Sequence, residues 1–183
     1  MKEKIEANLV ENKIIVWNPK QGSELYKLGY YGKPLGIPKP KTPEFNVPLI
    51  LDLFEGLYLK EKGLLTIYED DKELDEKELI KKAKKTYKDF LLKYFVYKDL
   101  REKNLIVQSG IKFGCDFAVY EHGPGIDHAP YLIQVKKEGE NLDATDIVRA
   151  GRLATTVRKR FIIAVPQPKT GKVEYLMFKW WKA

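Results

Sequence analysis

Cysteine, histidine and long apolar segments are scarce in this sequence of 183 residues. The single cysteine, Cys115, excludes an internal disulfide framework and any zinc site built from several cysteines. No apolar run approaches the roughly 18 to 20 residues that a membrane-spanning helix needs, and the first residues lack the apolar stretch of a signal peptide. Repeats and low-complexity segments are also absent. These absences predict a cytoplasmic protein that makes no contact with a membrane.

The overall composition is that of an ordinary folded protein. Hydrophobic residues make up 44% of the chain and charged residues 32%, which supplies a core and excludes a fully disordered protein. Lys and Arg outnumber Asp and Glu by 33 to 26, so the net charge is +7. The length suits one domain or two small ones.

Arginine is rare, but it is clustered. Only five of the 33 basic residues are Arg, and four of these fall within 12 residues: Arg149, Arg152, Arg158 and Arg160. A guanidinium group makes forked contacts to phosphate and stacks on bases. The cluster therefore indicates a binding site for a polyanion, and a solvated helix face is the alternative interpretation.

The beginning of the chain predicts a small antiparallel sheet followed by a basic loop. Residues 5–17 alternate between apolar and polar side chains and are rich in Val and Ile, which is typical of short strands. Residues 29–48 contain five prolines and three glycines, which exclude a helix or a central strand. This loop carries Lys33, Lys39 and Lys41, which either reach toward phosphates or belong to a simple linker.

A helix is predicted directly after the basic loop. Leu49, Leu53 and Leu57 share one helical face, and Gly63 suits the end of the helix. A short strand at 64–68 is expected to follow.

The middle of the chain is rich in lysine and predicts two further helices. Asp75 begins this segment, and we interpret it as two helices that meet around Lys85. A domain boundary is expected at the same place. The predicted domains are residues 1–85 and residues 86–183.

The remaining sequence predicts a compact α/β domain of three strands, one helix and two strands, separated by turns rich in Gly and Pro. Asp143 suits the N-cap of the helix, which is expected to end near Val157. At about 100° per residue, several basic and polar positions fall within an arc of about 100°, which predicts one basic face. These positions are Arg149, Arg152, Thr156, Lys159 and Arg160.

The two histidines lie in one loop between two predicted strands. His122 and His128 both belong to the segment EHGPGIDHAP, and Tyr120 directly precedes it. A histidine near neutral pKa is the natural group for proton transfer. Taken singly, each histidine is also compatible with an ordinary surface residue, and Tyr120 with an aromatic residue at the end of a strand.

Three motifs follow one another in this part of the chain, and their order is the basis of a resemblance to a known family. They are KFGCDFAVY at 112–120, HAPYLIQV at 128–135 and VRKRFIIAV at 157–165. Together they resemble the C-terminal domain of the archaeal tRNA-intron splicing endonucleases, and LFEGLYLKEKG at 53–63 resembles the N-terminal helix of that family. The similarity covers most of the chain.

The resemblance implies a fold that combines α+β and α/β parts. A small N-terminal mixed domain with antiparallel strands would precede a C-terminal, restriction-endonuclease-like α/β domain with a central mixed sheet. The implied activity is cleavage of precursor tRNA at bulge-helix-bulge splice sites, and no metal or other cofactor is expected.

The resemblance also implies three catalytic residues. The tyrosine that ends the first motif is Tyr120, the histidine that opens the second is His128, and the lysine that follows VR in the third is Lys159. Tyr120 would act as the base, although its reference pKa of ~10 makes it an awkward one. His128 would protonate the leaving oxygen, and Lys159 would stabilise negative charge at phosphorus. His122 is a minor alternative to His128.

The chemistry accounts for these residue types. RNA is cut without metal when its own 2′-OH attacks the adjacent phosphate, which leaves a 2′,3′-cyclic phosphate and a 5′-OH. This reaction needs a base, an acid and a cation, and the three implied residues supply one of each.

Recognition of a bulge-helix-bulge RNA implies planar side chains around a splayed-out base. Arg152 matches an arginine with which the family clamps such a base, and Arg149 lies on the same predicted helix face. Near the C-terminus, Trp180 stands where a second arginine is usual, and an Arg152 and Trp180 sandwich is our hypothesis. Lys33, Lys39 and Lys41 would add phosphate contacts.

The turn at 166–172 departs from the family pattern. Homotetrameric relatives carry an acidic loop here, whereas this chain has the basic sequence PQPKTGK. The difference favours a heterotetramer of two catalytic chains and two structural subunits as the implied assembly.

Two other functions stay open at this point. The first is a structural subunit of the same complex that binds RNA without cutting it. The second is a metal-dependent nuclease, because Asp116, Gln134 and Lys136 mimic the pattern of restriction-enzyme-like sites. That pattern is short, and it lacks a second convincing carboxylate for magnesium.

Overall fold

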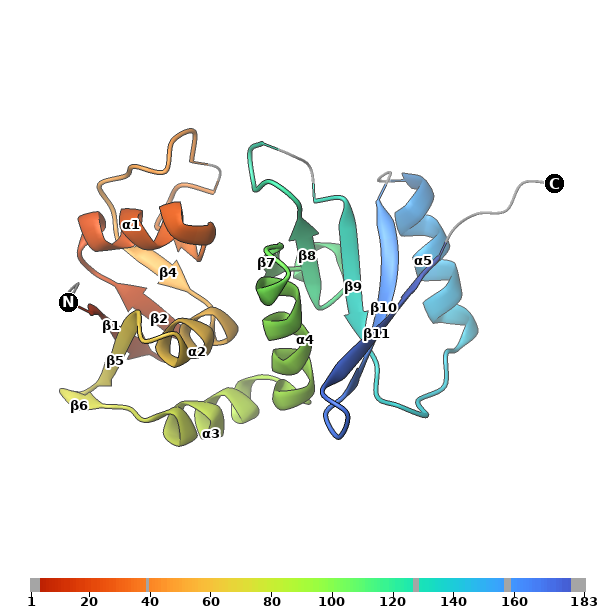
Figure 1. Cartoon of the computed structure of the whole chain (residues 1–183). Helices are drawn as coiled ribbons and strands as arrows, with labels where there is room; N and C mark the ends of the chain where they lie inside the picture. Colours follow the sequence, from red (N-terminus) through yellow and green to blue (C-terminus); the bar gives the residue numbers. More distant parts are fainter. Residues whose placement is uncertain (1–3, 39, 127–128, 157–158, 179–183) are drawn as a thin grey trace. The chain divides into compact units, whose positions relative to one another are not determined.

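The computed structural model of the chain describes residues 4–38, 40–126, 129–156 and 159–178. It divides into two compact units, residues 1–91 and residues 92–183 (Figure 1). Each unit has its own sheet and its own helices. The proposed division into folding domains at residue 85 stays a prediction.

The first unit contains a six-stranded mixed sheet in the order β3-β4-β2-β1-β5-β6. Its strands are β1 (Ile5–Val10), β2 (Lys13–Val16), β3 (Lys33–Pro34), β4 (Leu49–Leu51), β5 (Leu65–Glu69) and β6 (Lys72–Glu73). Its helices are α1 (Pro19–Gly29), α2 (Leu53–Glu61) and α3 (Glu76–Thr86). Strands β1 and β2 pair antiparallel, as the alternating pattern predicted, while β1 and β5 pair parallel.

Helices α1 and α2 pack against the same face of this sheet. Gly22 of α1 approaches Leu49 of β4, and Gly56 of α2 approaches Ile14 of β2. The two strands pair Ile14 with Leu51, so these side chains share one face. A Cβ atom added at Gly56 would lie 2.0 Å from Cδ1 of Ile14, so any larger residue here would force the buried Ile14 side chain to move.

The predicted helix beginning at Leu49 was wrong at its start. Residues Leu49–Leu51 form strand β4, and the helix begins at Leu53. Asp52 caps the helix, because its side chain accepts a hydrogen bond from the backbone N–H of Phe54 at 3.2 Å, and Glu55 bonds back to the N–H of Asp52 at 2.8 Å. This capping box sets the boundary between strand and helix.

Helix α1 was not predicted. The side chain of Asn18 accepts a hydrogen bond from the N–H of Lys20 at 3.0 Å, and Pro19 occupies the first helical position. An N-cap asparagine followed by proline is a recognised start signal, so the sequence contained a clue to this helix.

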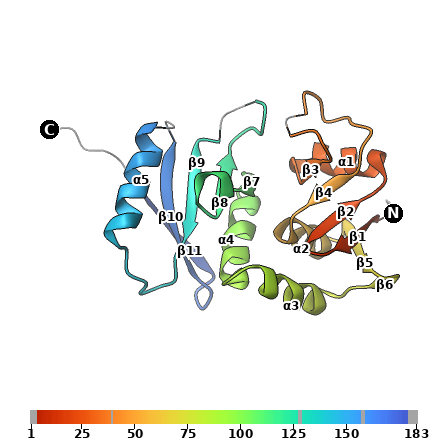
Figure 2. The same cartoon turned by 180° about the vertical axis from the view of Figure 1, so that it is seen from behind.

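The second unit is a five-stranded mixed sheet in the order β11-β10-β9-β8-β7, with one helix on each face (Figures 1 and 2). Its strands are β7 (Ile106–Ser109), β8 (Phe117–Tyr120), β9 (Tyr131–Val135), β10 (Arg160–Gln167) and β11 (Lys172–Met177). The helices are α4 (Phe90–Glu102), α5 (Ala144–Thr156) and a short 3-10 helix, Ile111–Phe113. The predicted order of strands and helices and the mixed sheet are confirmed.

Helix α4 covers one face of the second sheet. The rings of Tyr97 and Phe117 are 6.0 Å apart, and Arg101 donates a hydrogen bond from Nη2 to the carbonyl of Val107 at 3.1 Å. On the opposite face, a buried cluster forms from alternating positions of three strands. It consists of Cys115, Ala118, Ala129, Leu132, Phe161 and Ile163, with Phe113, Tyr120, Val165 and Phe178 packed against it.

The helix breaks and caps follow the predicted local signals. Helix α3 ends at Thr86 and α4 begins at Phe90, which confirms the predicted break near Lys85. The N–H of Asp146 donates to the side chain of Asp143 at 2.8 Å, and the N–H of Asp143 donates back to Asp146 at 3.4 Å. Asp143 therefore caps α5, as expected.

Candidate active site

Three chain segments meet at one edge of the second sheet. Strand β8 runs antiparallel to β9, and β9 runs parallel to β10. The end of β8 and the starts of β9 and β10 therefore lie at the same edge. Tyr120 is the last residue of β8, and Lys159 directly precedes β10. His128 lies outside the described residues, but Ala129, which follows it in sequence, belongs to this edge.

Lys159 is held against the segment that leads into β9. Its Nζ atom donates a hydrogen bond to the carbonyl of Ala129 at 2.5 Å and lies 5.1 Å from the centre of the Phe113 ring. The backbone N–H of Arg160 donates to the carbonyl of Pro130 at 2.8 Å. The lysine cation is thus fixed by both a carbonyl oxygen and an aromatic face.

Tyr120 packs beside the same residues. Its half-buried side chain contacts the buried cluster that contains Ala129, and Phe113 packs against that cluster too. The structure therefore brings a phenol group and an ammonium group into one neighbourhood at the sheet edge. These are two of the three side chains for which the sequence predicted a catalytic role.

A second set of side chains at this edge includes two residues that the sequence analysis missed, Glu121 and Tyr131. The hydroxyl of Tyr131 donates to Oε1 of Glu121 at 2.6 Å and accepts from Nη1 of Arg160 at 3.3 Å. The Arg160 guanidinium lies 5.6 Å from the centre of the Tyr131 ring. The hydrogen bond to the Glu121 carboxylate is the main cause that raises the pKa of Tyr131 above its ordinary value. Arg160 belonged to the arginine cluster, whereas for Glu121 and Tyr131 the only sequence signal was that they lie close to Tyr120 and His128 in the sequence.

The predicted basic face of one helix is wrong in part. The described helix α5 ends at Thr156, and Arg160 is the first residue of β10. Lys159 and Arg160 therefore do not continue the helical face, because the chain turns into a strand. Arg152 is exposed on α5, as expected; Arg149 belongs to the same helix, but its side chain lies outside the described part. Trp180 and Arg158 also lie outside the described residues.

The residues that mimic a restriction-enzyme pattern serve as cross-links. Oδ2 of Asp116 accepts hydrogen bonds from Nε2 of Gln134 and from the N–H of Val135, both at 2.8 Å. Its other oxygen pairs with Nζ of Lys93 at 2.6 Å. The Asp116 side chain is only 11% exposed. The carboxylate is thus engaged by three donors that join α4 and β9.

Lys136 of the same pattern ties the end of β9 to α5. Its Nζ atom lies 3.0 Å from Glu140 and 3.0 Å from Asp146. The hydrogen bond to Asp146 is the largest cause that raises the pKa of Lys136. Among the described residues, no group of three or more His, Cys, Asp or Glu side chains is arranged to hold a metal ion.

The basic loop at 29–48 is tied to its own unit. The N–H of Gly32 donates to the buried carboxylate of Glu55 at 2.8 Å, and the N–H of Phe45 donates to Oγ of Ser23 at 3.2 Å. The rings of Tyr26 and Phe45 are 5.7 Å apart. The segment also contributes strand β3 and leads into β4, so it joins elements of one sheet. It is therefore not a linker between domains.

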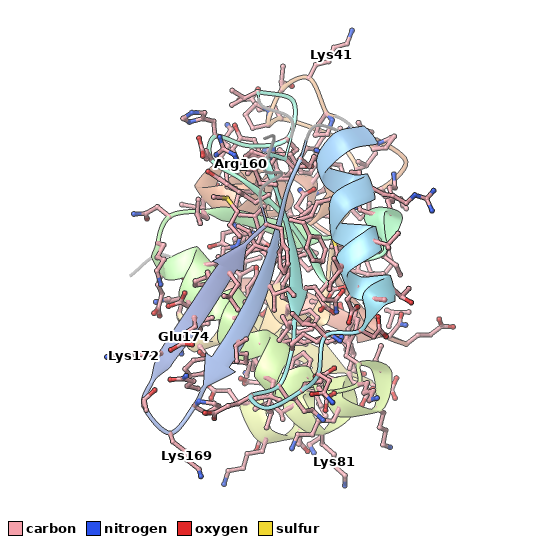
Figure 3. The ribbon with its side chains drawn as sticks, turned by 90° about the vertical axis from the view of Figure 1, so that its right-hand side faces the viewer. Lys41, Lys81, Arg160, Lys169, Lys172 and Glu174 are labelled. Atoms are coloured by element: carbon pink, nitrogen blue, oxygen red, sulfur yellow. The ribbon has the colours of Figure 1, made fainter. Side chains whose placement is uncertain are left out.

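Two of the lysines of this loop face solvent. Lys33 in β3 and Lys41 are exposed, and Figure 3 shows Lys41 projecting outward. Lys39 lies outside the described residues.

Known families match both units of the chain. A sequence model described as tRNA intron endonuclease, N-terminal domain, matches residues 5–80. A second, described as tRNA intron endonuclease, catalytic C-terminal domain, matches residues 90–175. The chain belongs to the tRNA intron endonuclease family. The resemblance and the fold expected from the sequence are confirmed.

Three archaeal relatives of this family are similar over nearly their full lengths, and each is named tRNA-splicing endonuclease. The protein of Hyperthermus butylicus is 45% identical over 97% of this chain and 99% of its own. The protein of Sulfurisphaera tokodaii is 45% identical over 96% of this chain and 98% of its own. The protein of Sulfolobus acidocaldarius is 41% identical over 97% of this chain and 99% of its own. In the described part of this family member, no helix is both long and apolar enough to cross a membrane.

Proposed function

We propose that this chain is the catalytic subunit of a tRNA-splicing endonuclease that cuts precursor tRNA at bulge-helix-bulge sites. The observation that carries the proposal is the meeting of Tyr120 and Lys159 at one sheet edge. Lys159 donates a hydrogen bond to the residue that follows His128 in sequence. A structural subunit would not need a base, an acid and a cation in these positions, which argues for the catalytic role.

The proposed reaction uses only groups of this chain and of the RNA. Tyr120 takes the proton of the 2′-OH, whose oxygen forms a bond to the adjacent phosphorus. Lys159 stabilises the negative charge that develops on the phosphoryl oxygens. The bond from phosphorus to the 5′-oxygen breaks, and His128 supplies the proton to that leaving oxygen. The products are a 2′,3′-cyclic phosphate and a 5′-OH.

Metal independence is part of the proposal. The engagement of Asp116 by Lys93, Gln134 and Val135 supports it, because a metal ion would have to displace these donors to reach the carboxylate. Magnesium binds through oxygen ligands and keeps several waters, and no donor set of that kind surrounds Asp116 in the described structure.

Cleavage of an intron-containing precursor tRNA in excess EDTA tests the proposal. We expect full activity, with 2′,3′-cyclic phosphate and 5′-OH ends on the products. A strict requirement for Mg²⁺ would instead promote the metal-dependent nuclease. Tight RNA binding without cleavage in any combination of subunits would identify a structural subunit.

We further propose that two copies of this chain assemble with two structural subunits. The turn that joins β10 to β11 exposes Lys169, and Lys172, the first residue of β11, is exposed beside it (Figure 3). A basic turn cannot make the charge-complementary contact that an acidic loop at this position would make with a second copy. We expect cleavage only when a structural subunit is added, whereas activity of the chain alone would refute this assembly. A cytoplasmic location is part of the same proposal.

The exposed loop lysines are expected to contact RNA phosphates. Replacing Lys33 and Lys41 with alanine should lower the slope of log K against log salt by roughly 0.7 to 0.9 per lost contact. Lys20→Ala, which removes an exposed lysine from α1 of the same unit, is the matched control. Fluorescence anisotropy of labelled precursor tRNA across a salt series measures the slopes. Equal slopes for the double variant and the control would contradict the role of the loop.

A further inference from the structure

We infer that Tyr131 is a positioning residue that holds the strand ends carrying Tyr120 and Lys159, through its contacts with Glu121 and Arg160. The inference rests on the proposed function, because it assigns a purpose to contacts beside the proposed catalytic groups. Tyr131 itself is not proposed to touch the RNA.

The backbone pairing of β9 ends at Tyr131 on both sides. The first pair between β9 and β10 is Tyr131 with Arg160, and the last pair between β8 and β9 is Val119 with Tyr131. Tyr120 lies one residue beyond the second pair, and Lys159 lies one residue before the first. Both proposed catalytic residues therefore lie just outside the residue pairs of β9. Tyr120 is still paired with Ile106 of β7, and the N–H of Arg160 bonds to the carbonyl of Pro130, so each is held at the backbone from one side.

The side chain of Tyr131 extends the connection past this point. One hydroxyl group bonds to Glu121, directly after Tyr120, at 2.6 Å, and to Arg160, directly after Lys159, at 3.3 Å. The guanidinium also lies over the Tyr131 ring at 5.6 Å. A single phenol thus joins the ends of three neighbouring strands.

These contacts lie on the other face from the proposed reaction. Successive side chains of a strand point to opposite faces. Tyr120 packs with the cluster that includes Ala118 and Leu132, so Glu121 and Tyr131 take the opposite face. Tyr131 can therefore fix the backbone without occupying the space needed by a phosphate beside Lys159.

Small displacements of a reacting group lower the rate of catalysis strongly. A shift of about 1 Å can cost a rate factor on the order of 10². Surface ion pairs and hydrogen bonds contribute little to overall stability. A positioning role therefore predicts a loss of rate that is out of proportion to any loss of stability.

The test compares two tyrosine-to-phenylalanine variants in the same unit. Tyr131→Phe removes both hydrogen bonds but keeps the ring beneath Arg160. Tyr175→Phe is the matched control, since the Tyr175 hydroxyl also donates a hydrogen bond to a carboxylate, that of Asp99, at 2.5 Å. Tyr175 lies away from the site, because in the sheet it pairs with Ala164, four residues beyond Arg160 along β10. Each variant is assembled as the active enzyme, and the single-turnover cleavage rate at saturating enzyme is measured with the affinity for uncut RNA.

We expect Tyr131→Phe to cut roughly ten- to a hundredfold more slowly than wild type, with unchanged RNA affinity and thermal stability close to that of Tyr175→Phe. Tyr175→Phe should cut at the wild-type rate. Glu121→Gln, which keeps an acceptor for the Tyr131 hydroxyl, should retain more activity than Glu121→Ala. The alanine variant should add little further loss when combined with Tyr131→Phe, because both remove the same connection.

Three outcomes would overturn the inference while leaving the proposed function intact. They are a wild-type rate for Tyr131→Phe, an equal loss of rate in both tyrosine variants, and weaker RNA binding at an unchanged rate. The last would make Tyr131 and Arg160 an RNA contact. Failure of the wild-type assembly to cut precursor tRNA would instead remove the proposed function itself.

Discussion

Replacing His128 with alanine is expected to lower the single-turnover cleavage rate by roughly 10²- to 10⁴-fold. The 5′-oxygen is a poor leaving group unless a proton reaches it as its bond to phosphorus breaks. An alanine cannot supply that proton, while the cations proposed to bind the RNA backbone remain in place. The affinity for uncut precursor tRNA should therefore stay close to that of wild type.

His122 provides the matched control for this experiment. It is the only other histidine of the chain and lies in the same loop, where its side chain is exposed. His122→Ala is expected to cut at the wild-type rate. If His122→Ala lost activity and His128→Ala did not, the acid role would move to His122. Full activity of both variants would remove histidine from the mechanism.

Replacing Asp116 with alanine is expected to destabilise the second unit by about 2 to 4 kcal/mol. The nearly buried carboxylate accepts from Gln134 and Val135 and pairs with Lys93. Its removal leaves a partly buried ammonium group and a backbone N–H without their partners. Thermal or urea unfolding followed by circular dichroism measures the loss.

Two further variants serve as controls for this loss of stability. Glu138→Ala, an exposed carboxylate of the same unit, should change stability by no more than about 0.5 kcal/mol. Asp116→Asn keeps an acceptor oxygen, so it should be less damaging than alanine, and it should still cut RNA in EDTA at a temperature where it is folded. A folded Asp116→Asn variant without activity would contradict a purely cross-linking role and would indicate that Asp116 takes part in the cleavage chemistry.

Local signals in the sequence predicted most of the second unit. The short apolar runs at 117–120 and 131–135, separated by a turn rich in Gly and Pro, predicted strands that the structure contains. Asp143 predicted the start of α5 because an N-cap acts on the helix that directly follows it. A short apolar run bounded by turns and the cap of a helix both depend on neighbours in sequence, so both can be recognised without the fold.

Short apolar runs in the first unit were ambiguous for a physical reason. The spacing of Leu49, Leu53 and Leu57 fits a helical face, but Leu49 and Leu51 also fit one face of a strand. The capping box of Asp52 and Glu55 resolves the ambiguity in favour of a strand that ends before the helix. Helix α1 was overlooked because its sequence shows little apolar periodicity, and the cap at Asn18 was its main local signal.

The candidate site was only partly predictable. Tyr120 and Lys159 were found through motifs whose order resembles the family, and the structure places them at one sheet edge. The link from Glu121 through Tyr131 to Arg160 was not foreseen. It depends on the register in which β9 pairs with both neighbours, and a shift by one residue would turn Tyr131 to the other face.

By itself the sequence determined the family, the strand and helix signals, and the types of residue that meet at the sheet edge, because these are carried by motifs and by local patterns. Only the tertiary structure decided that Asp116 and Lys136 cross-link the unit, that Arg160 begins a strand, and that the basic loop is anchored. Each of these depends on contacts between segments distant in sequence. Such contacts are set by strand register and by which faces are buried, and these arise only when the whole sheet forms.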